Sequence, residues 1–154
     1  MGVPWNAGND PKPSPEELPN ARPLMILIVD DEEGFRRWLQ WELSSLGMHV
    51  ETAEDGNQGA RMVEQNKFDV VITDISMPEM DGLKLLQEIR RSAPETEVIV
   101  ATGFGTVETA VHAMQKGAFD FILKPYSLDY LISRLQEAAT RLSRCRSCRR
   151  FTHE

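Results

Sequence analysis

The sequence predicts an α/β fold, a doubly wound parallel sheet of five strands that alternate with five helices. Continuous apolar runs recur along the chain, with 24–29 the strongest and 68–73 and 97–102 further on. Segments with apolar residues at helical spacing lie between these runs. Strands that alternate with helices form a parallel sheet with helices on both faces. The order therefore favours one layered domain.

The elements follow one another in a regular order, and turn residues separate several of them. Gly47 and Gly117 close two of the helical segments, and Asp55-Gly56 turns the chain into another. The predicted strands are 24–29, 48–53, 68–73, 97–102 and 119–123. The predicted helices are 33–46, a segment with Ala60 and Val63, a segment with Leu83, Leu86 and Ile89 that stops before Pro94, 106–116, and one that starts over 128–142.

Length and composition fit one domain with tails. The chain has 154 residues, of which 41% are hydrophobic, and a net charge of -7. We expect a flexible, proline-rich leader over 1–21, a folded domain over 22–142 and a basic tail over 143–154. The acidic body argues against direct nucleic-acid binding by the domain. No apolar run approaches the roughly 18 residues of a membrane span and no signal peptide is visible, so we expect no membrane contact and a cytoplasmic location.

Polar residues stand where the predicted strands end. Asp30 and Asp31 follow the first strand and Asp74 the third, while Thr102 ends the fourth and Lys124 follows the fifth. Functional groups of such sheets gather at the carboxyl ends of the strands. An Asp after a strand is often only a helix cap, but five polar residues at one edge are hard to explain that way.

This combination of side chains suits phosphoryl chemistry. Three carboxylates close together repel one another unless a positive group lies between them, and Mg²⁺ prefers carboxylate and carbonyl oxygens. A metal there would also neutralise an incoming phosphoryl group, so that Asp74 can attack it. The Thr102 hydroxyl and the Lys124 ammonium would then donate to the phosphoryl oxygens.

Four motifs over residues 22–142 resemble the receiver domains of two-component response regulators. They are Asp30-Asp31, Asp74 with Met77-Pro78-Glu79-Met80-Asp81-Gly82 behind it, Ala101-Thr102-Gly103, and Lys124-Pro125. The resemblance implies a flavodoxin-like (βα)5 fold with strand order 2-1-3-4-5. It also implies a signalling switch rather than an enzyme, a protein that catalyses only its own phosphorylation and dephosphorylation.

The resemblance assigns a role to each site residue. Asp74 is the expected phosphoacceptor. Asp31 is the expected main ligand of a Mg²⁺ or Mn²⁺ ion. Asp74 and the backbone carbonyl of Ser76 are expected as further ligands, and Asp30 is expected to contribute through water. Thr102 and Lys124 are expected to bind the phosphoryl group, and Phe121 to turn inward when Thr102 moves. The Lys124-Pro125 peptide bond is expected to be cis.

The stretches 102–105 and 118–125 look most like receivers of the nitrogen-regulator class, the sigma-54 activators. In that class the receiver usually precedes an ATPase and a DNA-binding domain. The chain is therefore either a stand-alone receiver or a fragment that lacks its effector. A sensor histidine kinase or phosphotransfer protein is the expected phosphodonor. The signal should leave through the face of the fourth helix, fifth strand and fifth helix, with a homodimer as one option.

Several alternatives stay open. The domain could be a degenerate receiver used only for dimerisation, although it keeps the acceptor and the lysine. A phosphatase of the haloacid-dehalogenase type needs a second Asp two residues after the nucleophile, where Ser76 stands. Phe121 could be a plain core aromatic. Cys145 and Cys148 have metal-ligand spacing, but with His153 they give three ligands against the four of a closed zinc site, so two exposed thiols are favoured.

Overall fold

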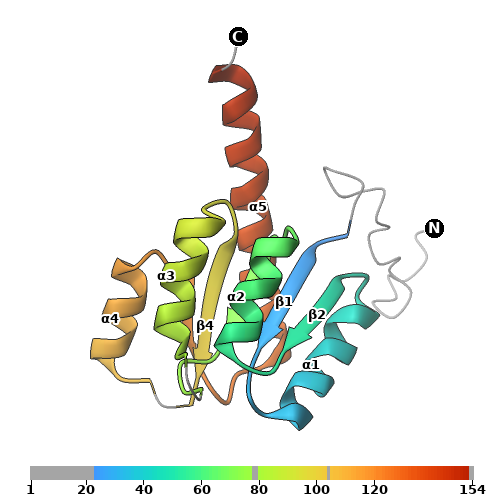
Figure 1. The fold of residues 1–154 in the computed structure, drawn as a ribbon. Helices are drawn as coiled ribbons and strands as arrows, with labels where there is room; N and C mark the ends of the chain where they lie inside the picture. Colours follow the sequence, from blue (N-terminus) through green and yellow to red (C-terminus); the bar gives the residue numbers. More distant parts are fainter. Residues whose placement is uncertain (1–22, 78–79, 104, 153–154) are drawn as a thin grey trace, which may run out of the picture.

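The computed structural model describes residues 23–77, 80–103 and 105–152, with side chains up to Leu142, so the predicted leader lies outside the described residues. Five strands alternate with five helices, as the sequence predicts (Figure 1). The strands are Met25–Val29 (β1), His49–Ala53 (β2), Val70–Thr73 (β3), Glu97–Thr102 (β4) and Asp120–Leu123 (β5). The helices are Glu33–Ser45 (α1), Gly56–Gln65 (α2), Gly82–Ser92 (α3), Val107–Gln115 (α4) and Leu128–Thr152 (α5).

The sheet is parallel throughout and has the order β2-β1-β3-β4-β5, which confirms the expected topology. β1 pairs with β2 on one side and with β3 on the other. The strand order reverses direction at β1 and β3, and a doubly wound sheet leaves a crevice for function at that point. The residues that follow β1 and β3 therefore lie at the centre of the functional edge.

Alternate residues of β1 enter two separate cores. Ile26 and Ile28 belong to the apolar cluster that includes Leu39 of α1 and Leu131 of α5. Leu27 and Val29 belong to the cluster with residues of α2, α3 and α4, and Figure 1 shows α2 and α3 over that face of the sheet. Both faces of β1 are thus covered, which explains why its sequence is a continuous apolar run rather than an alternating pattern.

Helix starts and stops follow the local sequence. The Asp55 carboxylate accepts a hydrogen bond from the backbone N–H of Gln58 at 2.8 Å, and the Asp81 carboxylate accepts one from Lys84 at 2.9 Å. These aspartates cap α2 and α3, because the first N–H groups of a helix have no partner within it. Gly47 and Gly117 end α1 and α4 with φ angles of 90° and 97°, a left-handed conformation that favours glycine.

Helix α5 has 25 residues and runs past Leu142 to Thr152, so most of the basic segment 143–154 continues the helix. Figure 1 shows its last turns extending beyond the sheet. Arg134 Nε lies 2.5 Å from Asp120 Oδ2, and Arg141 Nη1 lies 3.5 Å from Glu97 Oε2, so two ion pairs join the helix to β5 and β4. Cys145 and Cys148 belong to this helix, but their side chains lie outside the described part. No described helix combines the length and apolarity needed to span a bilayer.

Candidate functional site

Three side chains from the ends of three strands meet at the carboxyl edge of the sheet. Asp30 follows β1, Asp74 follows β3 and Lys124 follows β5. The Lys124 ammonium donates to Asp30 Oδ2 at 2.7 Å and to Asp74 Oδ2 at 3.1 Å. The two carboxylates are only 4% and 11% exposed. One half-buried cation therefore lies between two buried anions, an arrangement in which each charge depends on the others.

A backbone N–H orients the second oxygen of each carboxylate. Asp30 Oδ1 accepts from the N–H of Glu32 at 2.9 Å, and Asp74 Oδ1 accepts from the N–H of Ser76 at 3.1 Å. Arg36 of α1 donates to the backbone carbonyl of Asp30 at 2.8 Å, a contact that the sequence did not indicate. These bonds fix both carboxylates with one oxygen toward Lys124.

The two carboxylates also set the charge state of Lys124. Burial by itself lowers the pKa of the ammonium, because a charged group loses solvation. The hydrogen bond and charge of Asp30, followed by those of Asp74, outweigh burial and raise the pKa of Lys124 above its usual value. Lys124 is therefore a fixed positive charge at neutral pH, suited to pair with a further anion.

The oxygen donors fit a hard divalent cation, although the side chains are not gathered around one. Asp31 is exposed, and so is Ser76. Across 23–77, 80–103 and 105–142, no three Asp, Glu, His or Cys side chains form a group that could hold a metal ion. The positive charge between Asp30 and Asp74 comes from Lys124 instead. The donor chemistry at this edge is carboxylate and carbonyl oxygen, which Mg²⁺ and Mn²⁺ prefer.

Thr102 and Phe121 lie on the neighbouring strands. Thr102 is fully buried at the end of β4, and its backbone carbonyl accepts from the N–H of Lys124 at 2.9 Å. Phe121 of β5 is half-buried and packs against the core beneath α2, α3 and α4. A Cβ atom added at Gly105 would lie 2.8 Å from the Phe121 ring, so the β4–α4 loop runs directly over that ring. The packing agrees with both interpretations of Phe121, core aromatic and switch.

Two backbone features shape the same edge. The Lys124-Pro125 peptide bond is cis, which confirms the expectation. A Cβ atom at Gly82 would overlap the backbone carbonyl of Asp74, and the Gly82 N–H donates to Ile75 at 3.0 Å. The start of α3 is thus pressed against the backbone of Asp74. This contact is the physical reason for glycine in the Asp81-Gly82 motif.

Comparison with known proteins agrees with this geometry. The response regulator receiver domain matches residues 26–136. The chain belongs to this family.

The receiver is similar to two Escherichia coli proteins in particular. It is 40% identical over 117 residues to the transcriptional regulatory protein GlrR, and the match covers 76% of this chain and 26% of GlrR. It is 43% identical over 113 residues to the regulatory protein AtoC, and the match covers 73% of this chain and 24% of AtoC. The chain thus spans about a quarter of the length of the curated relatives that it matches.

A solved structure of the nitrogen-regulator class is also similar. The beryllofluoride-activated NtrC4 receiver domain dimer, solved in solution, superimposes with a TM-score of 0.72 at 34% identity, over 76% of this chain and 97% of that one. NtrX from Brucella abortus gives a TM-score of 0.76 at 35% identity, over 82% of this chain and 29% of NtrX. These relatives agree with the class that the motifs indicate.

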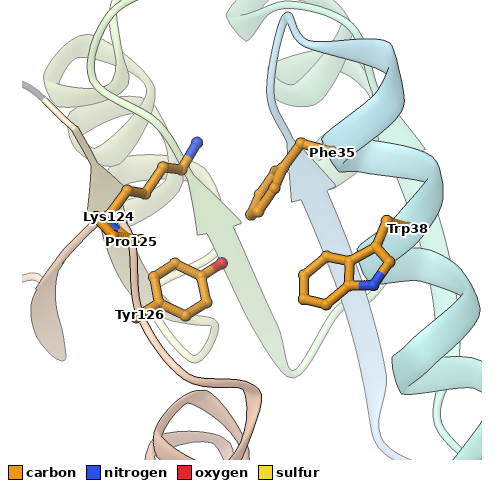
Figure 2. A pocket seen from close by; sticks show the side chains of 5 residues that line it. All are labelled: Phe35, Trp38, Lys124, Pro125 and Tyr126. Carbon is orange, nitrogen blue, oxygen red and sulfur yellow. The ribbon is translucent and has the colours of Figure 1, made fainter.

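The receiver also contains a cleft that sequence reasoning missed. It measures about 290 Å³ beside Lys124, and its walls are Phe35 and Trp38 of α1 with Pro125 and Tyr126 after β5 (Figure 2). Phe35 lies in the predicted helix 33–46 at the apolar spacing of a core-facing residue, a pattern that does not indicate a cleft. Tyr126 carried no signal, because the α1 side chains across the cleft from it, Phe35 and Trp38, are far away in sequence.

Proposed function

We propose that this receiver accepts a phosphoryl group on Asp74 from a phosphohistidine of a sensor histidine kinase or phosphotransfer protein, in a reaction that requires Mg²⁺ or Mn²⁺. The observation that carries the proposal is the Lys124 ammonium held between Asp30 and Asp74 at 2.7 and 3.1 Å. A cation beside Asp74 supports this role, because an incoming phosphoryl group would bring negative charge to that position.

The transfer forms one bond and breaks one. A carboxylate oxygen of Asp74 attacks phosphorus, the bond from phosphorus to the donor's imidazole nitrogen breaks, and its electron pair stays on that nitrogen. The product on Asp74 is an acyl phosphate. The protein's catalysis is confined to its own phosphorylation and dephosphorylation, in keeping with relatives that are regulatory proteins.

The chain's oxygen donors support the metal requirement. Asp31, Asp74 and the backbone carbonyl of Ser76 would hold the ion, with Asp30 contributing through water. When bound, the ion supplies positive charge that lowers the repulsion between the carboxylates and an incoming phosphoryl group. Since Lys124 now joins Asp30 to Asp74, its ammonium would exchange the Asp74 oxygen for a phosphoryl oxygen as the transfer proceeds.

The signal would leave through α4, β5 and α5. The Thr102 hydroxyl would move to donate to the phosphoryl group, and Phe121 would turn into the space that Thr102 leaves. Exposed apolar side chains on this face support a contact with a partner: Val107 (83% exposed), Val111, Met114, Leu123 and Tyr130. A second copy of the receiver is one such partner, and the NtrC4 relative is described as a dimer. We place the protein in the cytoplasm, where a sensor kinase would reach it.

Intact-mass spectrometry tests the acceptor. The protein is incubated with a small acyl phosphate, with Mg²⁺ or with chelator. Wild type and Asp129→Asn, an exposed control at the start of α5, should gain one phosphoryl group only with the metal. Asp74→Asn should gain none. An undiminished adduct on Asp74→Asn would refute the acceptor, and adducts formed in chelator would refute the metal requirement.

Amide hydrogen exchange tests the output face. Beryllofluoride, a phosphoryl mimic, should change protection in α4 and β5 as well as in the loops around Asp74. A population shift of this kind requires the mimic to bind the active arrangement more tightly than the inactive one. Changes confined to the loops around Asp74 would refute the propagated switch.

A further inference from the structure

The Lys124 ammonium has a third contact besides the two carboxylates. Its Nζ atom lies 4.2 Å from the centroid of the Phe35 ring. Figure 2 shows the Lys124 side chain reaching from the segment after β5 toward Phe35 on α1. The face of an aromatic ring attracts a cation, and the attraction is stronger where water is excluded. Because only 19% of the Lys124 side chain is exposed, we expect its attraction to the ring to be stronger than at an exposed site.

Other aromatic rings hold Phe35 in place. The Tyr126 ring meets it edge-on, with centroids 6.2 Å apart and planes at 85°, and the Trp38 ring lies 5.9 Å away. The Tyr126 hydroxyl is buried and has no hydrogen-bond partner among the described residues, so its ring packing, not its polar group, explains its place. Phe35 therefore has support from both α1 and the segment that carries Lys124.

The contact with Phe35 limits where the ammonium can go. A lysine side chain is a flexible four-carbon stem with a compact charge at its end. The hydrogen bonds to Asp30 and Asp74 hold that charge from one direction, and about 290 Å³ of open cleft lies beside it. Without the ring, the ammonium could swing into this cleft once its bond to Asp74 is exchanged for a phosphoryl oxygen.

We propose that Phe35, supported by Tyr126, is a positioning residue for phosphorylation, because its ring face holds the Lys124 ammonium beside Asp74 while the phosphoryl group arrives. The inference rests on the proposed function of Asp74. A leucine at position 35 would fill similar space and keep the apolar stripe of α1. Only an aromatic ring attracts the cation, so a leucine at this position separates the packing role of Phe35 from its attraction for the Lys124 ammonium.

Substitutions at position 35 test the proposal through the maximum rate of phosphorylation by a small acyl phosphate, with Mg²⁺ in excess. We expect Phe35→Leu and Phe35→Met to lower this rate about three- to tenfold, with little change in the half-saturating donor concentration. Phe35→Tyr should restore most of the rate. Trp41→Leu, the loss of a 73% exposed aromatic on the same helix, should have no effect.

Nuclear magnetic resonance tests the contact between Lys124 and the Phe35 ring in solution. In wild type and Phe35→Tyr, the ε-methylene protons of Lys124 should be shifted upfield by the ring above them. Phe35→Leu should lose this shift while keeping a folded spectrum. A Phe35→Leu rate equal to wild type, or an equal loss of rate in Phe35→Tyr, would overturn the proposal. A wild-type protein that takes no phosphoryl group would instead refute the function of Asp74, and the ring-current shift would still report the contact.

Discussion

Replacing Lys124 with methionine removes the only cation seen between Asp30 and Asp74 in the described part of the chain, and keeps a side chain of similar length. Both carboxylates then stay at the edge of the sheet without their shared partner. Removing one partner of a buried ion pair is costly, because the remaining charge is left without compensation. We expect Lys124→Met to fold, but with a clearly lower free energy of unfolding.

The structure indicates the size of this loss. Breaking a buried pair costs about 3–5 kcal/mol. Here Lys124 is 19% exposed, and each carboxylate keeps one backbone N–H donor, from Glu32 and from Ser76. Both features favour the low end of this range, a loss of about 3 kcal/mol in the free energy of unfolding. With a urea dependence of about 2 kcal/mol per molar, the unfolding midpoint should fall by about 1.5 M.

Urea unfolding with and without Mg²⁺ provides the assay, with Lys84→Met on the exposed side of α3 as the control. A metal at 100 times its dissociation constant adds about 2.7 kcal/mol to the folded state. Because the ammonium no longer competes for the carboxylates, Mg²⁺ should stabilise Lys124→Met more than wild type. A midpoint equal to that of the control, or a smaller Mg²⁺ effect than in wild type, would refute the reasoning.

Three further predictions follow from single contacts. Gly82→Ala should destabilise the fold by about 1–3 kcal/mol and slow phosphorylation, because the new Cβ would overlap the Asp74 carbonyl. Thermal unfolding checks this, with Gly34→Ala as the control, because a Cβ there contacts nothing. Tyr126→Phe should leave stability unchanged or raise it by about 1 kcal/mol, because its buried hydroxyl makes no described hydrogen bond; a clear loss in urea unfolding would contradict this. Stability should fall as pH rises above 10. Burial, together with the charges of Asp30 and Asp74, raises the pKa of Tyr126 above 10.0, and the pKa of Lys124 is raised above 10.5. At such pH values the native state therefore still holds protons that the unfolded chain has already released. Unfolding measured from pH 8 to 11.5 should show this fall, and a smaller one in Tyr126→Phe.

The strands and helices were predictable because burial and periodicity are local properties of the sequence. The predicted strand 97–102 and the closing glycines Gly47 and Gly117 agree with the structure. The strand order 2-1-3-4-5 is a different case. Its expectation came from family resemblance, since apolar runs alone do not say which strand lies beside which. The residues at the strand ends were predictable as a group, because parallel strands bring their carboxyl ends to one edge.

Details inside the site depend on contacts between distant segments, which periodicity cannot reveal. Nothing in the sequence indicated that Lys124 would lie between Asp30 and Asp74, or that Asp31 would be exposed while Asp30 is buried. The Phe35–Tyr126 contact joins α1 to the segment after β5 and has no local signature. Gly82 was visible as part of a motif, but its contact with the Asp74 backbone required the structure.

The ion pairs of Lys124 have a consequence for how the protein folds. The pair with Asp30 joins residues 94 positions apart in sequence, and the pair with Asp74 joins residues 50 apart. Closing such long loops has an entropic cost that only late, long-range packing can offset. We therefore expect the Lys124 contacts to form once β5 has docked on β4. A nascent or partly unfolded chain would carry the acceptor carboxylate without its lysine, so competence to receive a signal would itself report that folding is complete.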